Sequence, residues 1–334
     1  MLNETVLCAV SGGVNEGGQT AGLFAHLEKR CPNLRRLYLS NVKLTAPLPA
    51  SVEVLILSES SLSASALSVS RFYLKAQTDN LPRLRDVELL SVKLRKGTMA
   101  ALPAGVERLR IQETNMPATC FLQKHKKMAR CKAGRQAVVS RLAEVDLSDS
   151  TQLTFEEIVN VAKTWPHLIA LKLNGCFTRQ SMTSNGLALI LPYLGRLEVL
   201  EANGMSLTDQ AVYAICRYLC GSLRRLSIAG CPLTNLGASR IASGLTKLEW
   251  LNVSGCRQIK DKIFFSFVKI TSLRFLDVSR TLVTNDTVNL LESAMPTCEI
   301  VHSLTCRKFT NNIHRESKSV PCLVTDYCYT LSSE

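Results

Sequence analysis

Aromatic residues and histidines are scarce in this chain, and it has no long hydrophobic run. Only 6% of its 334 residues are aromatic and five are histidines. The histidines are scattered, and none lies in a nucleophile or metal-binding motif, so the sequence offers no catalytic constellation. No apolar stretch is long enough to cross a bilayer, and residues 1–7 lack the basic start of a signal peptide. We therefore expect neither an enzyme nor a membrane-bound protein, and no small-molecule substrate.

Glycine and cysteine also lack the spacings of known sites. The glycine pairs at 12–13 and 17–18 have no phosphate-loop lysine after them. The 13 cysteines are odd in number and show no regular pairing, which favours a reducing compartment. Cys216 and Cys220 are four residues apart on an expected helix, a spacing that permits metal binding, but two small residues packed against the core are the simpler interpretation. A last cluster, which matches no zinc template, contains Cys298, His302, Cys306, Cys322 and Cys328. We expect no metal and no cofactor.

Basic residues outnumber acidic ones. Forty lysines and arginines against 27 aspartates and glutamates give a net charge of +13. Such an excess favours an acidic partner surface, either nucleic acid, an acidic protein or a lipid headgroup layer, although the solvated flanks of a repeat protein would show it too. The first basic residue is Lys29, which follows Glu4 and Glu16, and this order disfavours a mitochondrial presequence. We expect a cytoplasmic protein, with the mitochondrion as the alternative.

Leucine, by contrast, is abundant and recurs in a fixed frame. Residues 223–281 contain LRRLSIAGC, LEWLNVSGC and LRFLDVSRT, which begin at intervals of 25 residues. They fit the frame L-x-x-L-x-L-x-x-C/N-x-L, whose residues we number from the first leucine. One copy cannot bury its apolar face alone, so the copies must stack. The ten copies start at Leu34, Val52, Leu84, Val106, Leu142, Leu168, Leu197, Leu223, Leu248 and Leu273.

This frame resembles the leucine-rich repeat family, and cysteine at its ninth position resembles the cysteine-containing subtype of F-box proteins. The resemblance implies an α/β fold: a right-handed, horseshoe-shaped solenoid with a parallel β-sheet on the concave face and helices or irregular segments on the convex face. It also implies that Cys176, Cys231 and Cys256 are buried structural residues that hydrogen-bond the backbone of a neighbouring turn. Valine cannot form that bond, so the turns at Val42 and Val92 need other partners.

Three regions are expected along the chain. Residues 1–33 form an N-terminal cap with a strand at 5–10, residues 34–301 form the solenoid, and residues 302–334 form a C-terminal cap or extension. The repeat spacing alternates between short and long as far as Val106 and becomes steady from Leu142. Prolines in the short repeats oppose helix formation. We therefore predict regular helices only from Leu142 onward.

A basic insertion at 117–141 interrupts the frame. It has no acidic residue, and Phe121 is its one aromatic residue, so base stacking is not supported. Contacts with phosphates or with an acidic protein both remain open. The residues that we call the basic patch are Lys124, Lys126, Lys127, Arg130, Lys132 and Arg135.

Frame positions three and five are expected on the concave face, because side chains alternate along a strand. The fifth positions from Glu88 to Glu201 carry charges of alternating sign, which can largely neutralise one another. Apolar groups are expected to be exposed at the two ends of the face, where we predict protein contacts; at the C-terminal end, the chain's own tail folding back with Ile313, Leu323 and Tyr327 is the alternative cover. The predicted protein-binding residues are Trp250, Phe275, Asn252 and Asp277 near the C-terminal end, and Tyr38 and Ile56 near the N-terminal end.

These features favour a non-enzymatic scaffold or adaptor that binds protein partners, as a subunit of a larger assembly. The alternative is an RNA-associated component, ribosomal or ribosome-assembling, that uses the basic patch. A ubiquitin-ligase substrate receptor is less favoured, because the segment before Leu34 is too short and polar for an F-box. A GTPase-activating relative is disfavoured too, since no catalytic arginine loop can be identified.

Overall fold

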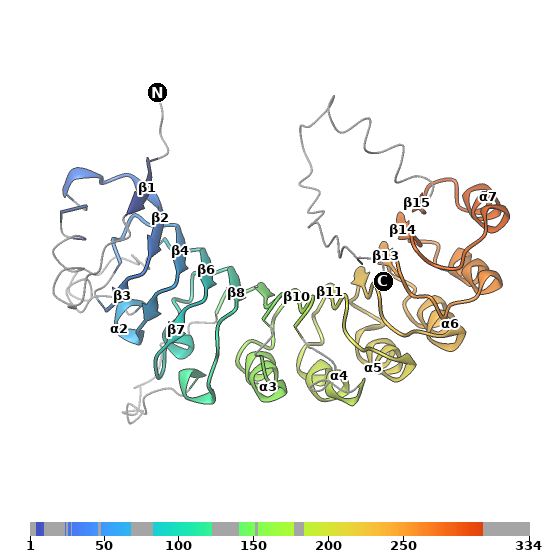
Figure 1. Cartoon of the computed structure of the whole chain (residues 1–334), viewed down its shortest axis with the longest axis horizontal. Helices are drawn as coiled ribbons and strands as arrows, with labels where there is room; N and C mark the ends of the chain where they lie inside the picture. Colours follow the sequence, from blue (N-terminus) through green and yellow to red (C-terminus); the bar gives the residue numbers. More distant parts are fainter. Residues whose placement is uncertain are drawn as a thin grey trace, which may run out of the picture.

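The computed structural model describes residues 5–9, 24, 26–27, 29–45, 48–67, 83–121, 140–150, 153–176 and 184–302. Its main element is a twelve-stranded parallel sheet in which each strand pairs with those of the preceding and following repeats. In Figure 1 the strands line the inner side of an arc, and helices α3 to α7 lie on its outer side. The fold is a solenoid with the sheet on its concave side, as the leucine frame predicts.

The strands become shorter along the chain. Those before the basic insertion have five to seven residues, whereas those after it have three. The first strand pairs in parallel with the second, so the strand predicted near the N-terminus is the first rung of the main sheet. The strands are β1 (Thr5–Ala9), β2 (Leu34–Ser40), β4 (Val54–Ser58), β6 (Asp86–Leu90), β8 (Arg108–Gln112), β9 (Glu144–Asp146), β10 (Ala170–Lys172), β11 (Val199–Glu201), β12 (Arg225–Ser227), β13 (Trp250–Asn252), β14 (Phe275–Asp277) and β15 (Glu299–Val301).

The outer side changes at the insertion. Before it, a second parallel sheet contains β3 (Lys43–Leu44), β5 (Ser61–Leu62) and β7 (Lys93–Leu94), together with the short helices α2 (Ala64–Leu67), η2 (Met99–Ala101) and η3 (Ala118–Phe121). After it come α3 (Phe155–Thr164), α4 (Ser184–Ile190), η4 (Leu191–Tyr193), α5 (Asp209–Leu219), α6 (Asn235–Gly244), η5 (Asp261–Lys269) and α7 (Asn285–Ala294). The α-helices after Leu142 have seven to eleven residues, as predicted, whereas η4 and η5 are 3₁₀ helices. Among the residues described, no helix is both long and apolar enough to cross a bilayer.

The core is one continuous apolar column. Frame positions one, four and six point into it, as Leu223, Leu226 and Ile228 do with no exposed surface. Neighbouring repeats place equivalent residues side by side, so the cluster extends from Phe24 to Ile300. Each repeat therefore depends on its neighbours for burial, which is the energetic basis of a solenoid.

The turn after each strand has the same backbone conformation in all ten repeats. The eighth frame residue has a positive φ in every one, between 65° and 69° for four glycines and between 47° and 63° for six other residues. In eight of the ten, its N–H donates to the carbonyl of the seventh residue of the next repeat, for example from Gly230 to Ser254 at 2.7 Å. The ten residues are Asn41, Glu59, Ser91, Glu113, Asp149, Gly175, Gly204, Gly230, Gly255 and Arg280.

Hydroxyl groups complete the turns that have valine at the ninth position. The Val42 N–H donates to Ser60 Oγ at 2.9 Å, and the Val92 N–H donates to Thr114 Oγ1 at 3.0 Å. In both cases the hydroxyl belongs to the ninth position of the following repeat. The turns that cannot use their own side chain thus take a partner from the next one.

A buried carboxylate joins the two kinds of repeat. Glu157 in α3 is 4% exposed. Its Oε1 accepts from the Met116 N–H at 2.8 Å, and its Oε2 accepts from the Thr154 N–H at 2.6 Å, as part of the capping box of α3. Phe121 also contacts Trp165 edge to face, with ring centroids 6.0 Å apart. The chain just before the basic patch is therefore fixed to the first regular helix.

Candidate functional site

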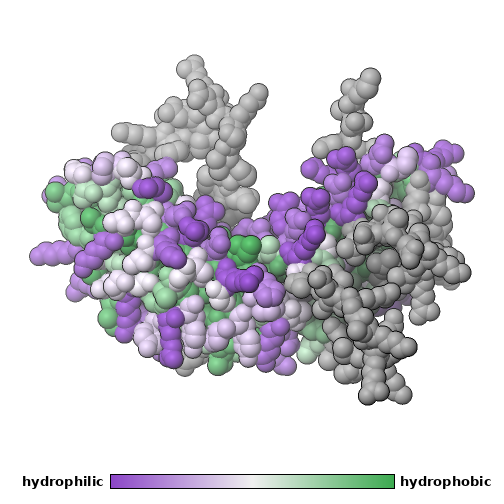
Figure 2. Space-filling model, turned by 180° about the vertical axis from the view of Figure 1, so that it is seen from behind, coloured by the Kyte–Doolittle hydropathy of each residue, from purple (hydrophilic) through white to green (hydrophobic). Residues whose placement is uncertain are grey.

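The concave face has the register that the sequence predicts. Strand pairing aligns the third positions with one another, including Trp250 with Phe275, and it aligns the fifth positions, including Asn252 with Asp277. Tyr38 and Ile56 are partners in the same way near the N-terminal end. Figure 2 shows the solenoid from behind, with hydrophilic side chains on both sides of the central hollow. The predicted binding residues at each end are thus neighbours, on separate parts of one face.

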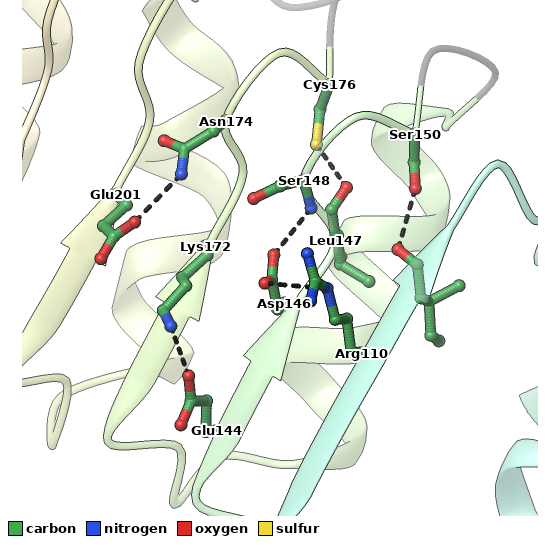
Figure 3. A network of polar contacts seen from close by, with 11 residues as sticks. Arg110, Glu144, Asp146, Leu147, Ser148, Ser150, Lys172, Asn174, Cys176 and Glu201 are labelled. Atoms are coloured by element: carbon green, nitrogen blue, oxygen red, sulfur yellow. Dashed lines mark hydrogen bonds and ion pairs between the residues drawn. The ribbon is translucent and has the colours of Figure 1, made fainter. Parts of the chain in front are cut away.

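Opposite charges pair in the middle of this face (Figure 3). Lys172 Nζ lies 2.6 Å from Glu144 Oε1, and Arg110 Nε lies 3.7 Å from Asp146 Oδ2. Burial acts to lower the pKa of the Lys172 ammonium, but the hydrogen bond and charge of Glu144 outweigh it, so this pKa is raised. Between β6 and β8, Arg108 donates a hydrogen bond of 2.7 Å to each carboxylate oxygen of Asp86.

This pairing differs in detail from the predicted alternation along the fifth positions. Arg110 and Asp146 are both at fifth positions, whereas Lys172 reaches diagonally to Glu144 at a third position. Glu201 instead accepts from the Asn174 amide at 3.0 Å. Long side chains can cross between rows when strands are about 4.8 Å apart. Ion pairs at a protein surface contribute about 0.2–1 kcal/mol each to stability, so the main effect of these partly exposed pairs is to neutralise the surface.

Three flat groups stack at the C-terminal end of the face. The rings of Trp250 and Phe275 are 4.9 Å apart and inclined by 4°. The guanidinium carbon of Arg225 lies 4.7 Å from the centre of the Trp250 ring. We call Arg225, Trp250 and Phe275 the aromatic stack. Both rings are partly buried, so the prediction that they are exposed was wrong in degree: they cover one another and Arg225 covers the indole.

The N-terminal pair is also partly covered. Tyr38 and Ile56 are each partly buried, and the Tyr38 hydroxyl is hydrogen-bonded to Ser58 Oγ at 3.0 Å. The phenol therefore has a partner within the chain. Tyr38 and Ile56 are therefore less exposed than the sequence predicts, and the Tyr38 hydroxyl is already hydrogen-bonded.

Asn252 and Asp277 have a structural task that the sequence reading missed. Oδ1 of Asn252 accepts from the Ser254 N–H at 2.9 Å, and Oδ1 of Asp277 accepts from the Ser279 N–H at 2.9 Å. Asp146 forms the same bond with Ser148. Asp or Asn two residues before serine is the signal for this turn. Each side chain is thus held in place by a hydrogen bond from its own backbone, which fixes how its remaining acceptors and donors face a partner.

The three frame cysteines are buried and hydrogen-bonded. Each thiol donates to the carbonyl of the sixth residue in the preceding repeat: Cys176 to Leu147 at 2.8 Å, Cys231 to Ala202 at 3.5 Å and Cys256 to Ile228 at 3.3 Å. Burial raises the pKa of the thiols of Cys176 and Cys231 to about 12 and that of Cys256 to about 11. These thiols are protonated at neutral pH and act as small core residues.

The described part of the chain contains no group of three residues suited to hold a metal ion. Cys216 donates to the Arg240 carbonyl at 3.4 Å, and Cys220 is exposed at the end of α5. Cys306, Cys322 and Cys328 of the C-terminal cluster lie outside the described residues, as does the whole basic patch.

No protein-family model matches this chain, and no curated protein matches it. Among solved structures, it is similar to an internalin (inlF) from Listeria monocytogenes. The identity is 14%, the match covers 86% of this chain and 88% of that chain, and the TM-score is 0.44.

Proposed function

We propose that this protein is a non-enzymatic scaffold, a subunit of a larger assembly, which binds a partner protein at the C-terminal end of its concave face. The observation that carries this proposal is the aromatic stack. Tryptophan and arginine are the residues that most often dominate binding energy at protein interfaces. Here they lie on neighbouring strands of one sheet and are already stacked, so little side-chain entropy would be lost when a partner binds.

The rest of the face supports this location. In the middle, Arg108, Arg110 and Lys172 already have carboxylates beside them. A partner that binds there has to compete with these contacts and gains little net charge attraction. The aromatic stack offers a partly exposed apolar surface instead, and burying it on binding is favourable at about 25 cal/mol per Å².

Replacing Trp250 and Phe275 together by alanine tests the proposal. Wild type and the double variant are purified by affinity tag from the native cell, and the co-purified proteins are quantified. We expect specific partners to be lost, while the melting temperature of the isolated chain changes little. Both rings are partly buried, so their removal should cost well below the ~3–5 kcal/mol of a core aromatic residue.

A matched control removes apolar groups from the outer side. Tyr213 and Leu236 lie on α5 and α6 and are 44% and 54% exposed. Their double alanine variant should keep every partner that the wild type binds. If the Trp250 and Phe275 variant also keeps them all, or if it unfolds, the proposed interface is wrong.

The narrower alternatives rest on other features. The six lysines and arginines of the basic patch and the net charge of +13 favour an RNA-associated role. Binding of a single-stranded RNA oligonucleotide that weakens steeply with salt, and is lost when the basic patch is changed to glutamate, would support it. The repeat cysteines alone favour a ubiquitin-ligase receptor. Eight of the nine cysteines in the described ranges, all but Cys8, are recorded as free thiols, which is consistent with the cytoplasmic location that we propose.

A further inference from the structure

We infer that the partner segment bound at the aromatic stack carries a carboxylate side chain that pairs with Arg225, next to an apolar side chain that covers Trp250 and Phe275. This inference rests on the proposed function and adds the chemistry of the partner. It depends on two observations: the state of Arg225, and the order of residues along the third frame positions.

Unlike the cations in the middle of the concave face, Arg225 has no carboxylate partner among the described residues. Its side chain is exposed, and across the described residues no carboxylate oxygen lies within 4.0 Å of its guanidinium nitrogens. Its neighbour in sequence, Arg224, contacts both Glu198 and Glu249. Stacking on Trp250 holds the guanidinium by its face and leaves the N–H groups at its edge for an acceptor. A carboxylate matches that edge with two parallel hydrogen bonds.

The order of side chains across the last four strands sets the pattern of the partner. Arg225, Trp250, Phe275 and Glu299 are aligned partners at third positions. Strands about 4.8 Å apart place the cation and the anion roughly 14 Å from each other, with the two rings between them. An extended chain presents every second side chain on one face, at about 6.6 Å intervals. An acidic, an apolar and a basic residue at alternate positions would span the same distance.

The same rungs disfavour a phosphate chain as the occupant. Glu299 is exposed at the far end of the row of third positions, and two more acids, Glu201 and Asp277, lie at fifth positions next to that row. A single carboxylate can meet Arg225 without approaching these acids, whereas successive phosphates along the row would be repelled. The geometry therefore points to a protein segment with one acid and one base.

The test uses a phage-displayed library of random twelve-residue peptides, selected on the full chain. Peptides that need the aromatic stack are those that bind wild type and fail to bind the Trp250→Ala, Phe275→Ala variant. We expect them to carry Asp or Glu two residues from an aromatic or aliphatic residue. In synthetic versions, changing that acid to lysine should weaken binding to wild type at least tenfold. The Arg225→Glu variant should reverse this preference by at least tenfold.

Arg36→Glu is the matched control, because Arg36 is exposed at the third position of β2 and the substitution changes the net charge equally. It should leave the preference for the acid unchanged. Peptides that need Trp250 and Phe275 but ignore Arg225→Glu would overturn the inference and leave the proposed function standing. If no peptide needs the two rings, both fail. Tighter binding of a ten-residue oligouridylate than of any peptide, lost on removal of the rings, would overturn the choice of a protein partner.

Discussion

Gly204→Ala tests the turn conformation that all ten repeats share. Gly204 has φ +69°, and a β-carbon added to it would meet no atom within 4 Å. The substitution therefore introduces backbone strain without a steric clash. A left-handed conformation costs an L-residue about 1–2 kcal/mol. Alanine also lowers the entropy of the unfolded chain, which stabilises the fold by about 0.4–1 kcal/mol. We expect a net loss of about 1 kcal/mol in the free energy of unfolding.

Gly195→Ala is the matched control. An added β-carbon at Gly195 also meets nothing within 4 Å, but its φ lies outside the left-handed range. This variant should be as stable as wild type or more stable by up to about 1 kcal/mol. Equilibrium urea denaturation followed by circular dichroism measures both, and the difference between the two variants isolates the cost of the turn. Equal stabilities would refute the shared left-handed turn.

Three further outcomes follow from the described contacts and the sequence. Thiol labelling of the native chain at pH 8 should modify exposed Cys220 well before Cys231, whose pKa is about 12, and similar labelling rates would contradict the burial of Cys231. Cys231→Arg should lower the free energy of unfolding by roughly 3–5 kcal/mol, because it buries a charge. Glu157→Ala should cost about 1–3 kcal/mol, because the buried N–H of Met116 loses its acceptor, and an unchanged urea midpoint would argue against that link. Changing residues 126, 127 and 130 of the basic patch to glutamate should weaken binding of an acidic partner steeply at low salt and leave the fold intact; unchanged binding at low salt would mean that the patch is only a solvated flank.

The sequence predicts the sheet register well because the physical constraints on it are strict. A slip of one residue would expose Leu226 and bury Arg225, or expose Leu251 and bury Asn252, so the apolar frame determines which residues align. Helix starts in the second half are similarly local, since Thr208 and Thr234 cap the helices that follow them.

Other features depend on contacts that no local pattern encodes. Glu59 does not favour a left-handed backbone, and the hydrogen bond from its N–H to the Leu90 carbonyl of the next turn holds it there. The link from Glu157 to Met116 joins residues 41 apart. The coverage of Trp250 depends on the side-chain conformation of Arg225, which the order of residues leaves open. Sequence reasoning therefore located the aromatic stack on the right face and overestimated its exposure.

Photo-crosslinking in the native cell tests the central claim most directly. Val199 lies at the third position of β11, one rung before Arg225, and is partly buried, so a benzoylphenylalanine placed there would point beside the aromatic stack. The same residue at exposed Leu236 serves as the control on the outer side. We expect a discrete crosslinked partner protein from position 199 and not from position 236, and its loss when Trp250 and Phe275 are changed to alanine. A partner captured equally from both positions, or one that persists without the two rings, would contradict a binding site on the concave face.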